Sequence, residues 1–243
     1  MALPDDLVTR MAGLSGQISG VALDNRTALA KELWRRTSTR DAVCTPLRRF
    51  LAQMAPGRQH CMYCGDNHGT DIDHFEPVTR NPLRTFDWLN HLLACSTCNS
   101  HQKRDQFPVD TDGRPLLIDP TLEDPFDHLF LSLSVGEYKA LTAKGRLTIE
   151  VCGLNRFLLS RGRVQARRVV AMSLRDWKQA FDTGDADQMQ VALQTVHEQP
   201  FADVCQAMLR QAITPGAEVL FEKAMDLLHL LRFEPLRELL LRD

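Results

Sequence analysis

The chain has 243 residues, with 29 basic and 31 acidic side chains and a formal net charge of −2 at pH 7. Apolar residues make up 44% and charged residues 25%, a balance that is typical of globular proteins and excludes a mainly disordered chain. The near-neutral charge excludes a protein that coats nucleic acid through its bulk charge, but it leaves binding through a local patch open. An odd number of cysteines, seven in all, argues against a secreted disulfide framework.

Residues 1–55 are predicted to form an N-terminal helical segment, because apolar residues recur there at helical spacing. Asp5 and Asp6 stand where a signal peptide would be basic, and no apolar run approaches the roughly 18 residues of a membrane helix. We therefore expect a cytoplasmic protein without a membrane segment. The arginines of this segment either touch phosphate or form a solvated helix face, and the pattern favours the solvated face. They are Arg35, Arg36, Arg40, Arg48 and Arg49.

Residues 56–108 contain two Cys-x-x-Cys pairs, Cys61 with Cys64 and Cys95 with Cys98. Two such pairs can close a tetrahedral site of four thiolates with no open position, which is typical of structural zinc. Four buried thiols or a redox dithiol are the alternatives, but a redox motif needs only one pair. Because the segment has few apolar residues to bury, we expect zinc binding to supply its folding free energy.

Between and just after the cysteine pairs lie residues suited to phosphodiester hydrolysis. The imidazole of His74 titrates near neutral pH and suits a general base, while oxygen ligands such as Asp73 and Asn99 suit Mg²⁺ or Mn²⁺. Asp73 and His74 would point to opposite faces of a strand, so they can serve one site only if the chain bends near Pro77. Asn99 and Lys103 are one helical turn apart and can share a face.

Residues 58–107 resemble the HNH endonucleases, whose ββα-metal module is often held by a four-cysteine zinc. The resemblance implies that His74 is the general base, that Asp73 and Asn99 bind one divalent cation, and that Asn90 orients the His74 ring. It also implies that Lys103 and Arg104 neutralise phosphate. The lysine lies four residues after the asparagine, where many members of the family have three, so His101 remains an alternative metal ligand.

The rest of the chain divides into a small β-rich segment, residues 109–155, and a C-terminal helical region, residues 156–243. Stretches 129–135 and 146–151 alternate apolar with other residues and predict an antiparallel sheet of two or three strands. Residues 227–243 are amphipathic and serve either as core or as a partner-binding helix, with core as the default. The predicted class is α+β, a zinc-stapled ββα-metal module embedded in a mainly helical protein.

Charge for binding nucleic acid is concentrated outside the cysteine segment. Residues 144–168 hold seven basic side chains and one acidic side chain, which predicts a salt-sensitive, sequence-independent contact with phosphates. A solvated helix face is the alternative. The residues predicted to contact nucleic acid are Lys103, Arg104, Arg156, Arg161, Arg163, Arg167 and Arg168.

Residues 115–168 resemble the HNH subunits of bacterial antiphage systems of the Septu and retron-associated type. The shared features are Asp119-Pro120 after the cysteine segment and a Gly-Leu-Asn-Arg run, residues 153–156, before a long helix. The resemblance implies a DNA-cleaving defence effector that works beside an ATPase of the ABC/SMC class. Three alternatives stay open: an HNH-type ribonuclease with tRNA as a candidate substrate, a restriction or homing endonuclease acting alone, and a non-catalytic zinc module that binds nucleic acid.

Overall fold

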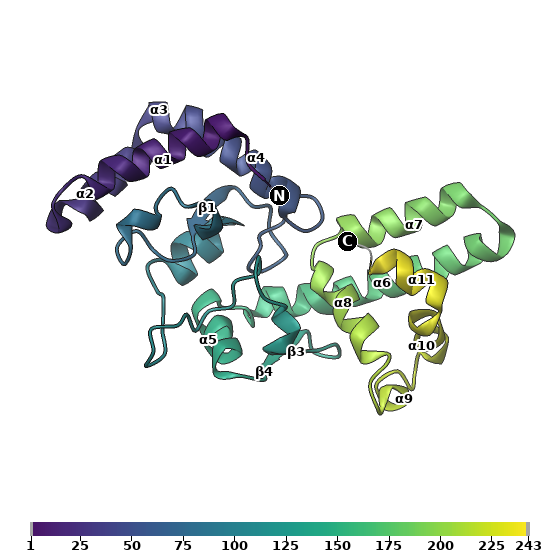
Figure 1. The fold of residues 1–243 in the computed structure, drawn as a ribbon. Coiled ribbons are helices and arrows are strands. Elements are labelled where there is room, and N and C mark those ends of the chain that lie inside the picture. Colours follow the sequence, from purple (N-terminus) through teal and green to yellow (C-terminus); the bar gives the residue numbers. More distant parts are fainter. Residues whose placement is uncertain (1, 242–243) are drawn as a thin grey trace.

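The computed structural model describes residues 2–241. It shows a mainly helical protein with two small antiparallel sheets, which confirms the predicted α+β class at that level. Helices of the N-terminal part arch over one side of the first sheet, and the C-terminal helices gather at the other end of the molecule (Figure 1).

The N-terminal part is helical, as its apolar spacing predicts. It consists of α1 (Asp5–Ser19), α2 (Leu23–Arg35), α3 (Thr37–Thr39), a π-helical turn η1 (Arg40–Cys44) and α4 (Thr45–Met54). Their apolar faces form one core cluster, which also takes in Phe86 and Leu93 from the cysteine segment. Burial of these apolar side chains therefore fixes the helices against the first sheet.

The first sheet is a two-stranded antiparallel pair that lies beneath the N-terminal helices (Figure 1). Strand β1 (Asp71–His74) pairs with β2 (His91–Ala94), and the 3₁₀ turns η2 (Pro82–Arg84) and η3 (Trp88–Asn90) lie in the connection between them. Strand β2 is buried along its whole length. Successive side chains point to opposite faces, so Leu93 packs with the N-terminal helices while Leu92 packs with α5 (Ala143–Cys152).

The second sheet pairs β3 (Leu129–Ser132) with β4 (Glu137–Ala140), after a 3₁₀ turn η5 (Pro125–Asp127). The strand predicted within residues 129–135 is therefore confirmed. Its predicted partner, residues 146–151, is wrong, because that stretch belongs to α5. The hairpin partner is the nearer segment, Glu137–Ala140.

Helix α5 forms where the alternating pattern predicts a strand, because local end signals and packing favour the helix. The Thr142 hydroxyl accepts a hydrogen bond from the Gly145 N–H at 3.1 Å and caps the first turn. Thr148, Val151 and Cys152 are buried at helical spacing. A Cβ at Gly145 would lie 2.0 Å from the His128 carbonyl oxygen, so the glycine allows α5 to approach the start of β3 closely.

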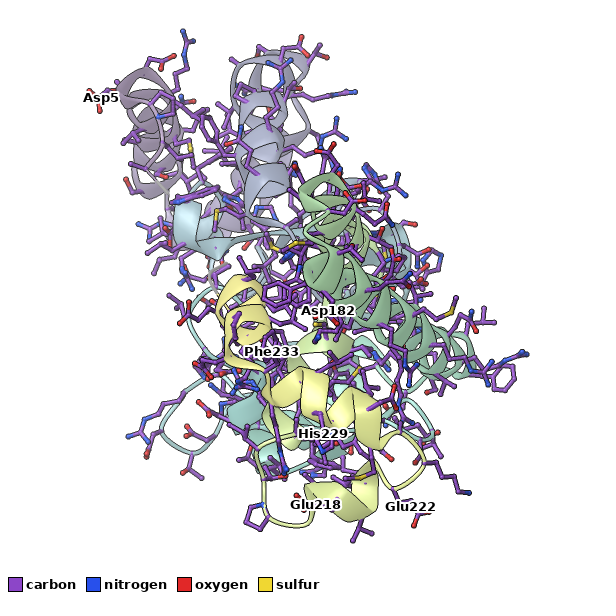
Figure 2. All side chains as sticks on the ribbon, turned by 90° about the vertical axis from the view of Figure 1, so that its right-hand side faces the viewer. Asp5, Asp182, Glu218, Glu222, His229 and Phe233 are labelled. Atoms are coloured by element: carbon purple, nitrogen blue, oxygen red, sulfur yellow. The ribbon has the colours of Figure 1, made fainter. Side chains whose placement is uncertain are left out.

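The C-terminal region is helical, as predicted. It comprises α6 (Phe157–Thr183), α7 (Ala186–Glu198), α8 (Ala202–Gln211), α9 (Ala217–Leu220), α10 (Met225–Arg232) and α11 (Glu234–Leu240). Leucines of α10 and α11 are buried in the same cluster as Trp177 and the four paired cysteines, so the amphipathic end of the chain serves as core over its described residues. Figure 2 looks onto these helices, with Phe233 turned toward α6 and with Glu218 and Glu222 at the outer edge. Within residues 2–241, no helix combines the length and apolar character needed to cross a membrane.

Candidate metal centre and catalytic cleft

The four paired cysteines, Cys61, Cys64, Cys95 and Cys98, meet in one buried cluster. Their sulfur atoms all lie within 4.8 Å of one another, and Sγ of Cys64 is 4.0 Å from Sγ of Cys95. Tetrahedral zinc with Zn–S bonds of about 2.3 Å places sulfurs about 3.8 Å apart. The cluster therefore could bind a zinc ion, and the soft thiolate set fits zinc better than a hard cation.

Groups around the cysteines are placed to stabilise thiolates. The Cys98 N–H donates to Sγ of Cys95 at 3.4 Å, and the guanidinium of Arg156 lies 3.6 Å from Sγ of Cys98. A second nitrogen of Arg156 donates to the Cys152 carbonyl at 2.9 Å. Arg156 was predicted to contact nucleic acid; the structure instead places its guanidinium beside Sγ of Cys98, where the negative charge of a metal-bound thiolate would attract it.

Asp73 is buried in β1 and its carboxylate holds together three parts of the chain. The Tyr63 hydroxyl, from the turn between Cys61 and Cys64, donates to Oδ2 at 2.6 Å, and Nζ of Lys103 lies 3.0 Å from the same oxygen. Burial raises the pKa of Asp73, and the Lys103 ammonium opposes that rise. Oδ1 has no hydrogen-bond partner in the described part of the chain, and Asp73 lines a cleft.

Lys103 is fully buried, so the prediction that it neutralises phosphate is wrong for this structure. Besides its ion pair with Asp73, Nζ donates to the His74 carbonyl at 2.8 Å. The reason lies in the backbone: residues Thr97–Lys103 (η4) form a π-helix, with more residues per turn than an α-helix. Asn99 and Lys103 therefore do not share a face as an α-helix would place them; Asn99 lines the cleft and Lys103 points into the protein.

The His74 ring is held in one orientation and in one tautomer. Its Nε2 lies 3.0 Å from the Thr85 carbonyl oxygen, and because a carbonyl only accepts, Nε2 carries the proton and Nδ1 keeps a lone pair. The ring packs edge-on against Trp34, with centroids 4.4 Å apart. Burial lowers the pKa of His74 to about 4, so the ring is neutral at pH 7 and able to accept a proton.

Asn90 does not contact the His74 ring, which corrects the role predicted for it. Its Oδ1 accepts a hydrogen bond from the Glu76 N–H at 2.8 Å, and its Nδ2 donates to the carbonyls of Glu76 and Arg84 at 3.0 and 3.1 Å. The side chain is fully buried and closes the long connection between β1 and β2. It therefore positions the Thr85 carbonyl, which lies in that connection, and acts on His74 only through it.

The cleft has a volume of about 350 Å³ and brings together several of the predicted site residues. Asp73, His74, Asn99 and Arg104 all line it. Strand β1 ends at His74 and the chain bends at the next two residues, which is the bend that the sequence requires for a joint site. His101 does not line the cleft; its ring is exposed and lies 3.1 Å from the Ser96 carbonyl oxygen, so the structure favours Asn99 over His101 as the candidate ligand.

The cleft offers oxygen donors of the kind that a hard cation prefers. The free Oδ1 of Asp73 and the side chain of Asn99 fit Mg²⁺ or Mn²⁺ by chemistry, whereas the Lys103 ammonium at Oδ2 opposes a second positive charge. Arg104 closes the π-helix with φ 50° and ψ −127°, a conformation that non-glycine residues rarely adopt and that is found mainly at functional sites.

The basic stretch 144–168 does not form one nucleic-acid surface. Lys144 pairs with Glu123 at 2.5 Å and Arg146 with Glu150 at 3.2 Å. Arg163 is buried and donates to the carbonyls of Gly136 and Leu154 at 3.1 and 2.9 Å, so its predicted contact with nucleic acid is wrong. Its guanidinium also lies 4.5 Å from the centre of the Tyr138 ring.

The remaining arginines of that stretch differ in their exposure. Arg167 is half-buried and donates to the Leu133 carbonyl at 3.3 Å. Arg161 and Arg168 are exposed on α6. A local excess of positive charge in the sequence is thus largely used for internal contacts, because a guanidinium can satisfy several backbone carbonyls at once.

Three residues that hold the candidate site in place do not stand out in the sequence, and of these only Trp34 lines the cleft. Thr85 orients His74 through its backbone carbonyl, Tyr63 binds Asp73, and Trp34 forms the wall beside His74. The tyrosine could have been suspected, because it lies between two cysteines. A backbone carbonyl in a long connection and a tryptophan 40 positions before His74 carry no such signal.

We predict that the protein loses stability as the pH falls from 7 to 5. His74 is protonated with a pKa of about 4 in the folded protein and about 6.5 in the unfolded chain, so the unfolded chain binds more protons in this window. Stability is therefore present above pH 6.5 and is lost as the pH falls toward 4, by about 2 kcal/mol between pH 7 and 5. Urea unfolding of the wild type and of His74→Gln at both pH values isolates this contribution, because acid loss of zinc is common to both. An equal loss in the two proteins would contradict the prediction.

Over 156 residues the chain is 24% identical to the Septu protein PtuB of Bacillus mycoides (strain KBAB4), and the alignment covers 52% of each chain. The chain thus spans about half the length of this curated relative. No family model matches the chain, and no solved structure matches it. The similarity shows a distant relationship to a Septu protein.

Proposed function

We propose that the chain is a metal-dependent endonuclease of the HNH type that hydrolyses phosphodiester bonds of DNA. The observation that carries the proposal is the His74 ring, which is neutral, fixed by the Thr85 carbonyl and placed in one cleft with Asp73 and Asn99. A general base needs a lone pair at a defined position beside the scissile bond, and Nδ1 of His74 meets that need.

In the proposed reaction Nδ1 of His74 takes a proton from water, whose oxygen attacks the phosphorus. The bond from phosphorus to the 3′ oxygen breaks, and the departing oxygen takes a proton from solvent, which leaves 5′-phosphate and 3′-hydroxyl ends. Mg²⁺ or Mn²⁺ bound at Asp73 and Asn99 would compensate the charge on the departing oxygen. Thr85 holds the imidazole so that Nδ1 stays unprotonated until it accepts the proton, and Arg104 binds phosphate at the mouth of the cleft.

The proposed setting is antiphage defence in the bacterial cytoplasm, as one component of a system with an ATPase of the ABC/SMC class. Its support is the distant similarity to a Septu protein together with the resemblance of residues 115–168 to the HNH subunits of such systems. The relationship covers about half of each chain, so the partner is proposed on that resemblance.

One observation favours a second candidate, a zinc module that binds nucleic acid without cutting it. The Lys103 ammonium lies 3.0 Å from Oδ2 of Asp73 and occupies part of the carboxylate that a catalytic cation would use. In this alternative the cleft holds phosphate and no divalent cation, and His74 has a structural role only.

Cleavage tests the two candidates directly. We expect the wild-type protein, alone or with its co-purified partner, to cut duplex DNA with Mg²⁺ or Mn²⁺, and His74→Ala to lose activity by about 10² to 10⁴-fold while it keeps zinc and stays folded at the assay temperature. Asn99→Ala should lose metal-dependent activity, whereas His101→Ala, a matched change outside the cleft, should cut as the wild type does. A His74→Ala variant of full activity would overturn the proposal, and preferential cleavage of tRNA in parallel assays would replace DNA by RNA as the substrate.

A further inference from the structure

Three cavities follow one another along the segment Gly69–His74. The first, of about 370 Å³, is lined by Gly69 together with Arg48 and Arg49 of α4. The second, of about 610 Å³, is lined by the next three residues, 70–72, and the third is the cleft at His74. The first and second cavities share Arg48, and the second and third share Trp34, Arg35 and Ile72. The three cavities therefore adjoin one another in a row, and we call this row the basic groove.

The walls of the basic groove carry an excess of positive charge. Its six basic residues are Lys31, Arg35, Arg40, Arg48, Arg49 and Arg104, and its three acidic residues are Asp71, Asp73 and Asp105. Asp73 is already neutralised by Lys103. Within residues 2–241, none of the basic residues from the N-terminal helices that line the groove forms an ion pair with a carboxylate. Their charge is therefore available to a ligand.

We propose that the basic groove binds the phosphate backbone of double-stranded DNA and leads it to His74. The inference rests on the proposed function for the identity of the nucleic acid, and it assigns the binding surface to α2, η1 and α4, which arch over β1 (Figure 1). Five residue steps of extended chain cover about 17 Å, which corresponds to about five base-pair steps along the axis of B-DNA and to fewer phosphates along the longer path of the backbone. The groove thus has the length and the charge to hold several successive phosphates.

We prefer the groove to the arginines of α6 as the DNA-binding surface, because more of the groove arginines are free to contact a ligand. Of the five arginines between 156 and 168, Arg163 is buried, Arg156 contacts Sγ of Cys98 and Arg167 is half-buried, so Arg161 and Arg168 are the fully exposed members of that set. In the groove the exposed arginines converge on one strand, and that strand ends at the candidate base. A phosphate backbone in the groove would therefore pass the reactive side chain, whereas no observation links α6 to the cleft.

The test is the salt dependence of DNA binding without Mg²⁺ or Mn²⁺, measured by fluorescence anisotropy on a 20-base-pair duplex. The variant Arg40→Gln/Arg49→Gln removes one charge from the first cavity and one from the second, and it spares Arg48, which donates to the Thr70 carbonyl at 3.3 Å. Each lost phosphate contact lowers the slope of log K against log salt by about 0.9. We therefore expect the slope to fall by about 2 and the affinity at 0.1 M salt to fall by about 60-fold.

The matched control is Arg161→Gln/Arg168→Gln, which removes the same charge from α6 and should leave the slope and the affinity unchanged. If both double variants lost the same DNA affinity, binding would depend only on the total charge of the protein, and the inference would be overturned. It would also be overturned if the wild-type protein showed no salt-sensitive binding of DNA. Tighter binding of an RNA duplex than of the DNA duplex would overturn its choice of ligand. If the wild-type protein bound DNA through the groove but never cut it, the proposed catalysis would be wrong, whereas the inference on binding would stand.

Discussion

Replacing Cys61 by alanine is expected to abolish zinc binding and to unfold residues 56–108. The cysteine cluster is buried, and the described structure has no helix or strand between the end of α4 at Met54 and the start of β1 at Asp71, so a bound metal would hold this part of the chain in place. Apparent zinc-binding free energies of about 10–16 kcal/mol in four-ligand sites are as large as the whole stability of an average domain. Zinc content by atomic emission and protection of this segment from hydrogen exchange would measure both effects.

The control for that change is Cys44→Ala, because Cys44 is a lone, half-buried thiol outside the cluster. It should keep one zinc per chain and lose little stability. If Cys61→Ala kept its zinc and its exchange protection, the four cysteines would be ordinary core residues, and the metal centre would have to be abandoned.

Replacing Lys103 by methionine is expected to destabilise the protein by about 3–5 kcal/mol, because it leaves the buried Asp73 carboxylate without its cation. The methionine fills a similar volume, so the loss reports the ion pair with Asp73 and the hydrogen bond to the His74 carbonyl, and not a cavity. Urea unfolding at pH 7 would measure the free energy, and cleavage at a temperature where the variant is still folded would show whether activity follows stability.

The neighbouring Arg104 provides the contrast, since it is exposed and lines the cleft. Arg104→Gln should change the free energy of unfolding by no more than about 0.5 kcal/mol but should weaken binding of DNA. If Lys103→Met were as stable as the wild type and only its DNA affinity fell, the lysine would face solvent in solution and the phosphate-binding role would be restored.

The sequence predicts the cysteine cluster well, because that feature depends on spacing. Two residues between paired cysteines set the geometry of a metal site directly, and the four sulfurs do converge. The helical N- and C-terminal regions likewise follow from apolar periodicity. The hairpin β3–β4 was only half predicted, since both 137–140 and 146–151 were available partners for β3.

What the sequence could not give is the direction in which each charged side chain points. Lys103 and Asn99 are four residues apart, and only the π-helix decides that one is buried and the other lines the cleft. Arg163 reads as a surface residue by composition, yet it satisfies two backbone carbonyls inside the protein. Such outcomes depend on contacts between distant segments, which local pattern does not encode.

The position of Trp34 determines how much of the chain must be moved together if the site at His74 is to keep its environment in another protein. The stretch that resembles a nuclease begins more than 20 positions after Trp34, yet the Trp34 indole closes one face of His74 and stacks at 5.4 Å on His91. A graft of residues 56–108 into another protein would carry all four cysteines and His74. It would leave the His74 imidazole open to water, so the pKa of the ring would return toward its ordinary value. The smallest portable unit of this protein therefore starts in α2, upstream of the boundary that its motifs suggest.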